Sequence, residues 1–507
     1  MKRWSFSYPV AFIIALLALM PIVVLVILAA DSPQLFDSRN LEILLNTVSL
    51  MLLTAIGAVL IGVPLAILTA YVKLSWARFW LVLLAAPLAI PSYIGGFTLY
   101  AAFGTGGEIA GLTGLALPSV SGLFGTSLVM ALYTYPFVML TVRASLLGLD
   151  ASQINAARTL GMSLPQSFYS VVLPRIKNGI AAGALLAAMY ALSDFATPSI
   201  LRLDTFTRMI YVEYNSFGLS QSAMLSLQLL VIVSFVLLLE SRFKTVRERP
   251  GQALAFWPRP LHKVLIFAIC TPVIVLAIIL PLAVFGLWLW REGAGDFELV
   301  YAWNSAYAAL FAAIAAVVCA LPLALAATQG RFGRLMERAS YLGFGVPGIV
   351  MGTALVYVGL HFSVLYQTLG LLILAYVMRF VPLAVGSIRS TYERLDPSLV
   401  NAARLLGASP KEAFSRVTLP LTIRGVIAGA ALVFLEVMRE LPATLILSPF
   451  DFETLATYLW RVYEAGYFGQ AAVPGLLLVL ISALALALMF YGERWNQAGI
   501  VEDVSHK

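Results

Sequence analysis

Apolar runs of about twenty residues recur along the whole chain, and they constrain its fold more than any other feature. A helix needs about 20 residues to cross the hydrocarbon core of a bilayer. The runs begin near Tyr8 and continue to near Tyr491, and no independent polar domain lies among them. Only 11% of the 507 residues are charged, against roughly 25% in a soluble domain. The sequence therefore predicts a multi-pass helical membrane protein and excludes a soluble globular fold.

The runs predict an all-α fold of about twelve transmembrane helices. The first follows Lys2 and Arg3 as a signal peptide would, but it exceeds the usual length of a signal core, so we expect it to be retained. The predicted spans are Tyr8–Ala30, Asn46–Ala70, Phe79–Ala102, Gly122–Val142, Gly179–Leu201, Ser222–Leu239, Val264–Trp290, Ala302–Ala327, Ala339–Leu360, Leu369–Ile388, Gly425–Leu447 and Ala471–Tyr491.

The distribution of Lys and Arg predicts the orientation. With a cytoplasmic N-terminus, most of the 32 Lys and Arg residues fall in cytoplasmic segments, and the outer segments hold Arg39, Arg202, Arg208, Arg291 and Arg461. This is the bias expected of cytoplasmic loops. We therefore predict a bacterial cytoplasmic (inner) membrane protein with both termini in the cytoplasm. The net charge of +7 then needs no nucleic-acid partner.

The second half of the chain repeats the first. Asn155–Gly161 reads NAARTLG, and Asn401–Gly407 reads NAARLLG at an offset of 246 residues. The same offset relates Pro136 and Pro382, Arg143 and Arg389, Asp150 and Asp396, Ser163 and Ser409, Gly179 and Gly425, and Asp194 and Glu440. Nearer the start of each half, Asn46 and Pro64 match Asn304 and Pro322.

The duplication predicts the domain organisation. Residues 1–240 form the first six-helix repeat, 241–263 a basic cytoplasmic linker, and 264–507 the second repeat. Because an even number of spans separates the copies, both repeats have the same orientation and are related by a pseudo-twofold axis along the membrane normal.

Each repeat contains a cytoplasmic loop with the start and stop signals of a short helix. Asp150 and Asp396 stand where the helix begins, and Asp396 is followed by a proline, which suits the first helical position. Gly161 and Gly407 stand where it ends, at a position that favours left-handed backbone.

A second helix is predicted directly after each glycine. The spacing of Ser163 with Gln166, and of Ser409 with Glu412, is that of a capping box. We expect this second helix to end at Leu173-Pro174 or Leu419-Pro420. Each loop is therefore predicted to be a helix–turn–helix at the membrane surface.

These loops resemble the EAA motif of ABC importer permeases. In that family the short helix lies in a groove of a cytoplasmic ATPase and transmits its closure, and the resemblance implies a fold like that of type I importers. The residues that it assigns to ATPase coupling are Asn155, Ala156, Ala157, Arg158, Gly161, Leu173 and Pro174, and Asn401, Ala402, Ala403, Arg404, Gly407, Leu419 and Pro420. Asn155 and Asn401 replace the usual Glu, so no contact that needs a carboxylate there is implied.

The resemblance also implies the partners. They are a homodimer of a cytoplasmic ABC ATPase and a periplasmic or extracellular substrate-binding protein. The chain contains no Gly-Lys dipeptide, hence no Walker A phosphate loop. We therefore expect a transport subunit that binds no cofactor and is not itself an enzyme, with ATP and Mg on the partner ATPase.

Two further stretches are similar to those of fused iron(III) permeases, the membrane component of ferric-binding-protein-dependent importers. Ser193–Pro198 reads SDFATP and Arg439–Thr444 reads RELPAT, close to the "DFGTP" and "ELPAT" stretches of that family, and Phe452–Ala456 also fits. This resemblance implies a permease for iron(III). Permeases for thiamine, aminophosphonate or polyamine share the architecture and remain alternatives.

Charged residues within the predicted spans are candidates for the translocation pathway. Ionised side chains at membrane depth are costly and normally face a bundle interior or a watery cavity. The candidates are Asp194, Arg379, Arg439 and Glu440. They either form structural ion pairs, or the two acids flank a central pathway, where Tyr190 lies one turn from Asp194 and the oxygens suit a hard trivalent cation.

No resident metal site is assigned. Cys270 and Cys319 lie inside apolar runs, and the three histidines are scattered. An ion-coupled secondary transporter is the alternative from another class, but it would not require two capped cytoplasmic loops. A membrane enzyme would need a cluster of acids or histidines in a loop facing water, and the largest outer loops lack one.

Overall fold

The computed structural model describes residues 7–30, 38–73, 75–115, 117–216, 218–240, 242 and 260–484. Throughout this part of the chain the regular structure is helical, and the only strand-like feature is one bridge between Gly104 and Leu117. Helices satisfy every backbone polar group within one segment, which a bilayer requires because its core holds no water. The all-α expectation is confirmed. Most of the predicted linker, residues 243–259, lies outside the described residues.

The chain forms two compact units that interleave the two halves of the sequence. Unit 1 contains residues 1–35, 209–230 and 297–461, and unit 2 contains residues 36–208, 231–296 and 462–507. Helices α11 (Phe206–Asn215), α12 (Leu219–Glu240) and α23 (Leu455–Glu464) cross from one unit to the other. The predicted boundaries of the sequence repeats stay a prediction, since they describe duplication and not packing.

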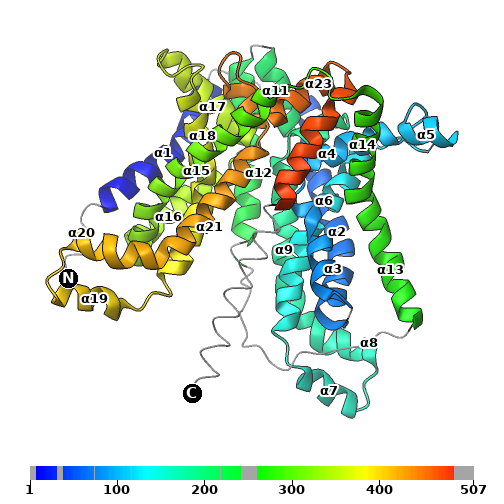
Figure 1. Ribbon diagram of the computed structural model, residues 1–507, viewed down its shortest axis with the longest axis horizontal. Helices are drawn as coiled ribbons and strands as arrows, with labels where there is room; N and C mark the ends of the chain where they lie inside the picture. The colour runs from blue at the N-terminus through cyan, green and yellow to red at the C-terminus, as the bar shows by residue number, and fades with distance from the viewer. Residues whose placement is uncertain are drawn as a thin grey trace. The chain divides into compact units, whose positions relative to one another are not determined.

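Unit 2 is built around three long helices, α2 (Ser38–Tyr71), α6 (Gly122–Leu147) and α9 (Leu173–Ser193), which all pack on one another. In Figure 1, α7 and α8 lie beyond their lower ends. The other elements are α3 (Ala77–Ala85), η1 (Ala86–Leu88), α4 (Ser92–Ala102), α5 (Glu108–Thr113), α7 (Ala151–Thr159), α8 (Leu164–Ser167), η2 (Phe168–Val172), α10 (Ala196–Ile200), α13 (Pro260–Ile274), η3 (Val275–Ile279), α14 (Leu280–Glu292) and η5 (Phe468–Ala471).

Unit 1 has the equivalent core. Helices α15 (Leu299–Thr328), α18 (Leu369–Tyr392) and α21 (Leu419–Met438) all pack on one another, and α19 and α20 lie at their lower end in Figure 1. The other elements are α1 (Ser7–Ala29), α16 (Arg331–Gly345), α17 (Gly348–His361), α19 (Pro397–Leu405), α20 (Pro410–Ala413), η4 (Phe414–Thr418) and α22 (Pro442–Leu447).

The first helix of each repeat packs on the other repeat. Helix α1 packs on α15, α16 and α17 of the second repeat, while α13 and α14 contact α3 and α4 of the first. This exchange explains why the compact units do not follow the order of the sequence.

Nine described helices are long and apolar enough to cross a membrane, or eleven if each of two bent pairs is one span. In the pair Ala77–Leu88 and Ser92–Ala102 the axis bends by 85°, beside Pro87 and Pro91. The twelfth predicted span, Ala471–Tyr491, runs past the described residues, which carry a shorter apolar helix, Phe468–Leu484.

Two predicted spans are wrong in their outer part. The expected helix Gly179–Leu201 ends at Ser193 and resumes as the short helix α10, and the expected helix Gly425–Leu447 ends at Met438 and resumes as α22. The cause is the same in both: an acid at the break accepts a hydrogen bond from a backbone N–H of the next short helix, as described below.

Candidate coupling loops and intramembrane charges

The first loop has the predicted start and stop. The Asp150 carboxylate accepts a hydrogen bond from the Ser152 N–H at 2.9 Å and caps α7. At the other end Gly161 has φ of +90°, and the Met162 N–H donates to the Ala157 carbonyl at 3.2 Å. This six-to-one hydrogen bond is the Schellman arrangement, which needs left-handed backbone at the glycine.

The second loop repeats this geometry. Asp396 accepts from the Ser398 N–H at 2.9 Å, and α19 begins at Pro397 as predicted. The hydrogen bond from Ser398 holds the pKa of the Asp396 carboxyl below its ordinary value. Gly407 has φ of +93°, and the Ala408 N–H donates to the Ala403 carbonyl at 3.0 Å. The caps and glycine turns are confirmed in both halves.

The capping boxes are also present, but the helix that follows each of them does not stop at the Leu-Pro pair. The Ser163 N–H donates to Gln166 Oε1 at 2.9 Å, and the Ser409 N–H donates to Glu412 Oε2 at 2.8 Å. Each helix then widens for one turn, η2 or η4, and continues into α9 or α21. Pro174 and Pro420 lie in the first turn after the wide turn, where a missing N–H is tolerated. The loop is therefore a short helix and a turn joined directly to a span.

Both loops expose apolar and small side chains. Leu160 is 82% exposed, and Leu405 and Leu406 are each 89% exposed. Asn155, Ala156 and Arg158, with Asn401, Ala402 and Arg404, are exposed on the short helices; Ala157 is buried, and Ala403 is half-buried. Leu173 and Leu419 are half-buried, and Pro174 and Pro420 are exposed. Beside α7 an open groove of about 630 Å³ is lined by Leu160, Gly161, Met162, Pro165, Gln166, Tyr169 and Ser170.

Asp194 lies at the break between α9 and α10 and is surrounded by hydroxyl groups. Its carboxylate accepts hydrogen bonds from the Ser92 hydroxyl, from the Thr197 hydroxyl at 2.8 Å and from the Thr197 N–H at 3.1 Å. The Tyr190 hydroxyl lies 3.3 Å from Ser92 Oγ. The sequence-predicted pair Asp194 and Tyr190 therefore shares one cluster of oxygens, joined through Ser92, which sequence reasoning missed.

Glu440 occupies the equivalent place in unit 1 but is paired with a cation. Its carboxylate forms an ion pair with Arg379 on α18 and accepts from the Ala443 N–H at 3.2 Å. The side chains are 6% and 15% exposed. A Cβ added at Gly348 would lie 2.1 Å from Arg379 Nη1, so only glycine leaves room for the guanidinium. At the offset of 246 residues, Arg379 corresponds to Tyr133, and Asp194 therefore lacks the equivalent arginine.

Arg439, the fourth predicted intramembrane charge, forms an ion pair with Glu436 one turn earlier. Sequence reasoning passed over Glu436 although it lies inside a predicted span. It also missed Glu337 on α16, which is buried and paired with Arg389 on α18. For Glu436 the available signal was an acid within an apolar span, whereas Glu337 lies in a basic segment outside the predicted spans and gave no such signal.

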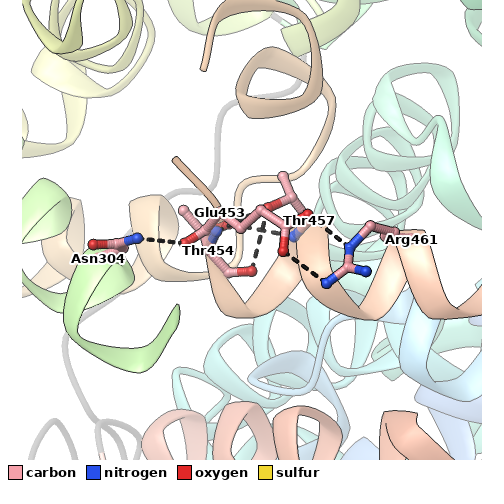
Figure 2. Close-up of polar contacts among 5 residues, drawn as sticks. All are labelled: Asn304, Glu453, Thr454, Thr457 and Arg461. Atoms are coloured by element: carbon pink, nitrogen blue, oxygen red, sulfur yellow. Dashed lines mark hydrogen bonds and ion pairs between the residues drawn. The ribbon is translucent and has the colours of Figure 1, made fainter. Parts of the chain in front are cut away.

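The repeated asparagines anchor the turn that leads into an amphipathic helix. Figure 2 shows Asn304, whose Nδ2 donates to the Glu453 carbonyl at 2.9 Å just before α23. In unit 2, Asn46 Nδ2 donates to the Asp204 carbonyl at 3.1 Å. In the turn of Figure 2, Arg461 also pairs with Glu453, at 2.7 Å between Nε and Oε1. The duplication therefore extends to individual hydrogen bonds.

Comparison with known proteins agrees with this duplication. The family described as binding-protein-dependent transport system inner membrane component matches the chain twice, at residues 62–246 and 314–496. The chain is 33% identical to the Fe(3+)-transport system permease protein FbpB 2 of Haemophilus influenzae over 90% of both chains. It is 24% identical to a probable ABC transporter permease protein, y4fN, of Sinorhizobium fredii, over 91% of this chain and 89% of that one.

Shorter relatives match about one repeat. A probable molybdenum ABC transporter permease protein of Haloferax volcanii is 30% identical over 45% of this chain and 85% of its own. These relatives are transport subunits, and two of them match this chain over 90% and 89% of their own length. The double match and the full-length relatives together show that the chain belongs to the inner membrane components of binding-protein-dependent transport systems, as a membrane-spanning ABC transporter permease.

Proposed function

We propose that this chain forms the translocation pathway of an ATP-driven importer for iron(III) in a bacterial inner membrane. A separate binding protein delivers the cation at the outer face. A homodimer of a cytoplasmic ATPase binds the α7 and α19 loops and supplies ATP and Mg. Both termini lie in the cytoplasm, as the Lys and Arg distribution predicts.

The oxygen cluster around Asp194 is the observation that carries the choice of cargo. Relatives of this chain include an Fe(3+) permease and permeases named for molybdate or tungstate, which are oxyanions. A carboxylate with hydroxyl donors and no equivalent of Arg379 attracts a cation and repels an oxyanion. Carboxylate, phenol and hydroxyl oxygens are also the ligands that hard cations prefer. The cluster therefore favours iron(III) over an anion.

The two acids have different roles in this proposal. Arg379 neutralises Glu440 in the second repeat, so that carboxylate holds α18 against the break before α22. Asp194 in the first repeat keeps its charge for the passing cation. The sequence left both acids with two possible roles, a structural ion pair or a place in the pathway. We assign the structural role to Glu440 and the pathway role to Asp194.

We expect Asp194→Asn to lower iron(III) uptake at least tenfold while leaving the amount of protein in the membrane unchanged. The amide keeps most hydrogen-bonding capacity but loses the charge. The measurement is uptake of radioactive iron by cells, with molybdate uptake in parallel. Asp204→Asn, ten residues along the chain, is the control and should retain uptake. Full iron uptake by the Asp194 variant, or uptake of molybdate by the unmodified protein, would contradict the proposal.

Two properties of α7 and α19 support ATPase binding there: both helices are exposed, and both are short and capped at each end. Both are short rigid helices closed by a glycine turn, and both present apolar side chains to the surroundings. Exposed apolar groups of this kind mark protein interaction sites when they gather in one place. The groove beside α7 adds a surface into which a partner side chain can fit.

Valine at Gly161 or Gly407 is expected to uncouple ATP hydrolysis from import. A Cβ at either position meets nothing within 4 Å, so the damage comes from the positive φ alone. Left-handed backbone costs a non-glycine residue roughly 1–2 kcal/mol, which is enough to shift a surface turn without unfolding a span. The measurement is iron import and cargo-stimulated ATP hydrolysis in proteoliposomes. Ala408→Val is the control, and normal coupling in both glycine variants would show that the loops are ordinary connectors.

A further inference from the structure

Arg389 lies on the last turns of α18, and two carboxylates bind it. Its Nε lies 2.7 Å from Glu393 Oε1, one turn further along the same helix. Its Nη1 forms an ion pair with Glu337, which is on α16 and only 4% exposed. Arg389 therefore ties the end of α18 to α16.

The first repeat has the equivalent arginine but neither of the two carboxylates. At the offset of 246 residues, Arg389 corresponds to Arg143 and Glu393 to Leu147. An offset of 256 residues pairs Arg78 with Arg334, Pro91 with Pro347 and Gly96 with Gly352, and it places Leu81 at the position of Glu337. Leucines therefore stand in the first repeat where the second repeat has Glu337 and Glu393. Because buried ion pairs are often no more stabilising than apolar side chains of similar volume, stability alone does not account for Glu337.

The pair lies next to the second loop. Backbone hydrogen bonds run without a gap from the end of α18 towards α19: Glu393 donates to Arg389, Arg394 to Thr391 and Leu395 to Tyr392. The next residue is Asp396, the cap of α19. A displacement of α19 is therefore passed to the end of α18, where Arg389 is held by Glu337.

The same helix carries a second buried ion pair among the described residues of unit 1. Arg379, which binds Glu440, lies ten residues before Arg389, or about 15 Å along the helix axis. Helix α18 is thus tied near α19 by one ion pair and near the break before α22 by another.

We propose that Glu337 and Arg389 are positioning residues that hold the second loop against α16 during transport. The proposal rests on the proposed coupling of α19 to an ATPase.

The test uses Glu337→Gln and Glu337→Asp in the complete transporter with its ATPase and binding protein, in proteoliposomes. We expect Glu337→Gln to be as abundant as the unmodified protein, because Arg389 is 30% exposed and keeps Glu393 as a partner. We expect it to hydrolyse ATP, while iron imported per ATP falls about fivefold or more, the scale of a typical coupling between sites. Glu337→Asp keeps the charge and should recover part of this ratio. The exchanged pair Glu337→Arg with Arg389→Glu should also recover part of it.

Two results would overturn the proposal. One is an unchanged import-to-ATP ratio in Glu337→Gln, and the other is a loss of import that only follows a loss of protein from the membrane. Gly407→Val distinguishes failure of the ion-pair proposal from failure of the proposed coupling of α19 to the ATPase. If Gly407→Val is uncoupled and Glu337→Gln is normal, the loop couples without the ion pair. If both are normal, the coupling role of the loop fails as well.

Discussion

Replacing Gly183 with leucine is expected to remove most of the folded protein from the membrane. Helix α9 packs on α6 at Gly179 and Gly183, which are four residues apart and face the same side. A Cβ at Gly183 would lie 2.5 Å from the Val138 Cα, so the backbone of α6 would have to move. The Thr141 hydroxyl, which donates to the Gly179 carbonyl at 2.9 Å, would be displaced with it. We expect a loss of about 3 kcal/mol, the upper part of the usual range for overpacking.

The measurement is the amount of protein in the membrane and its melting temperature in detergent. Gly286→Leu on α14 is the matched control, since a Cβ there meets nothing within 4 Å. Gly429→Leu, at the equivalent place in unit 1, should behave like Gly183→Leu because its Cβ would lie 2.9 Å from the Ala384 Cα. Near-normal abundance of the Gly183 variant would show that α6 and α9 do not need this close approach.

Glu440→Gln is expected to destabilise the protein strongly, and removal of Arg379 as well should restore much of the loss. The single change leaves a guanidinium that is 15% exposed beside a neutral amide. An unpaired buried charge of this kind costs about 3–5 kcal/mol, whereas replacing both partners by apolar groups is often neutral. The test compares the melting temperature and abundance of Glu440→Gln, Arg379→Met and the double variant Glu440→Met with Arg379→Met.

Asp194→Asn provides the comparison within the same experiment. Its hydrogen-bond donors are hydroxyls and a backbone N–H, so the variant leaves no stranded cation among the partners described above. It should therefore be as abundant as the unmodified protein although its iron(III) uptake is at least tenfold lower. A double variant at 379 and 440 that is no more stable than Glu440→Gln would argue against the ion pair as the cause.

The local features of the loops were predictable because their causes are local. The capping and turn residues affect only backbone groups within six residues, and their spacing therefore predicts the hydrogen bonds that they form. They are Asp150, Ser163 with Gln166, and Gly161. The number of spans was predictable to within the two bent pairs and the end of the chain. Hydropathy reports how apolar a segment is and does not depend on its neighbours.

Features that depend on distant residues were not predictable in the same way. Averaged hydropathy passes over the breaks at Asp194 and Glu440, since the short helices that follow are apolar too. Arg389 was recognised as the repeat equivalent of Arg143, but its ion pair was not predictable because its partner Glu337 is 52 residues away in the sequence. Nothing in the composition of α1 indicates that it packs on helices of the second repeat, since hydropathy reports how apolar a span is and not which span it contacts.

The packing of each repeat's first helix on the other repeat affects the order in which the protein can fold during synthesis. Helix α1 ends at Ala29, whereas the helices on which it packs begin at Leu299, 270 residues later. At a synthesis rate of about 5–20 residues per second, α1 waits roughly 15 to 55 seconds for them. During that interval its interhelical face is covered by lipid or by insertion machinery. Helix α13, in contrast, is synthesised after α3 and α4. Unit 2 can therefore begin to pack while most of unit 1 is still being translated. A chain truncated after the first repeat would contain α1 without the helices on which it packs.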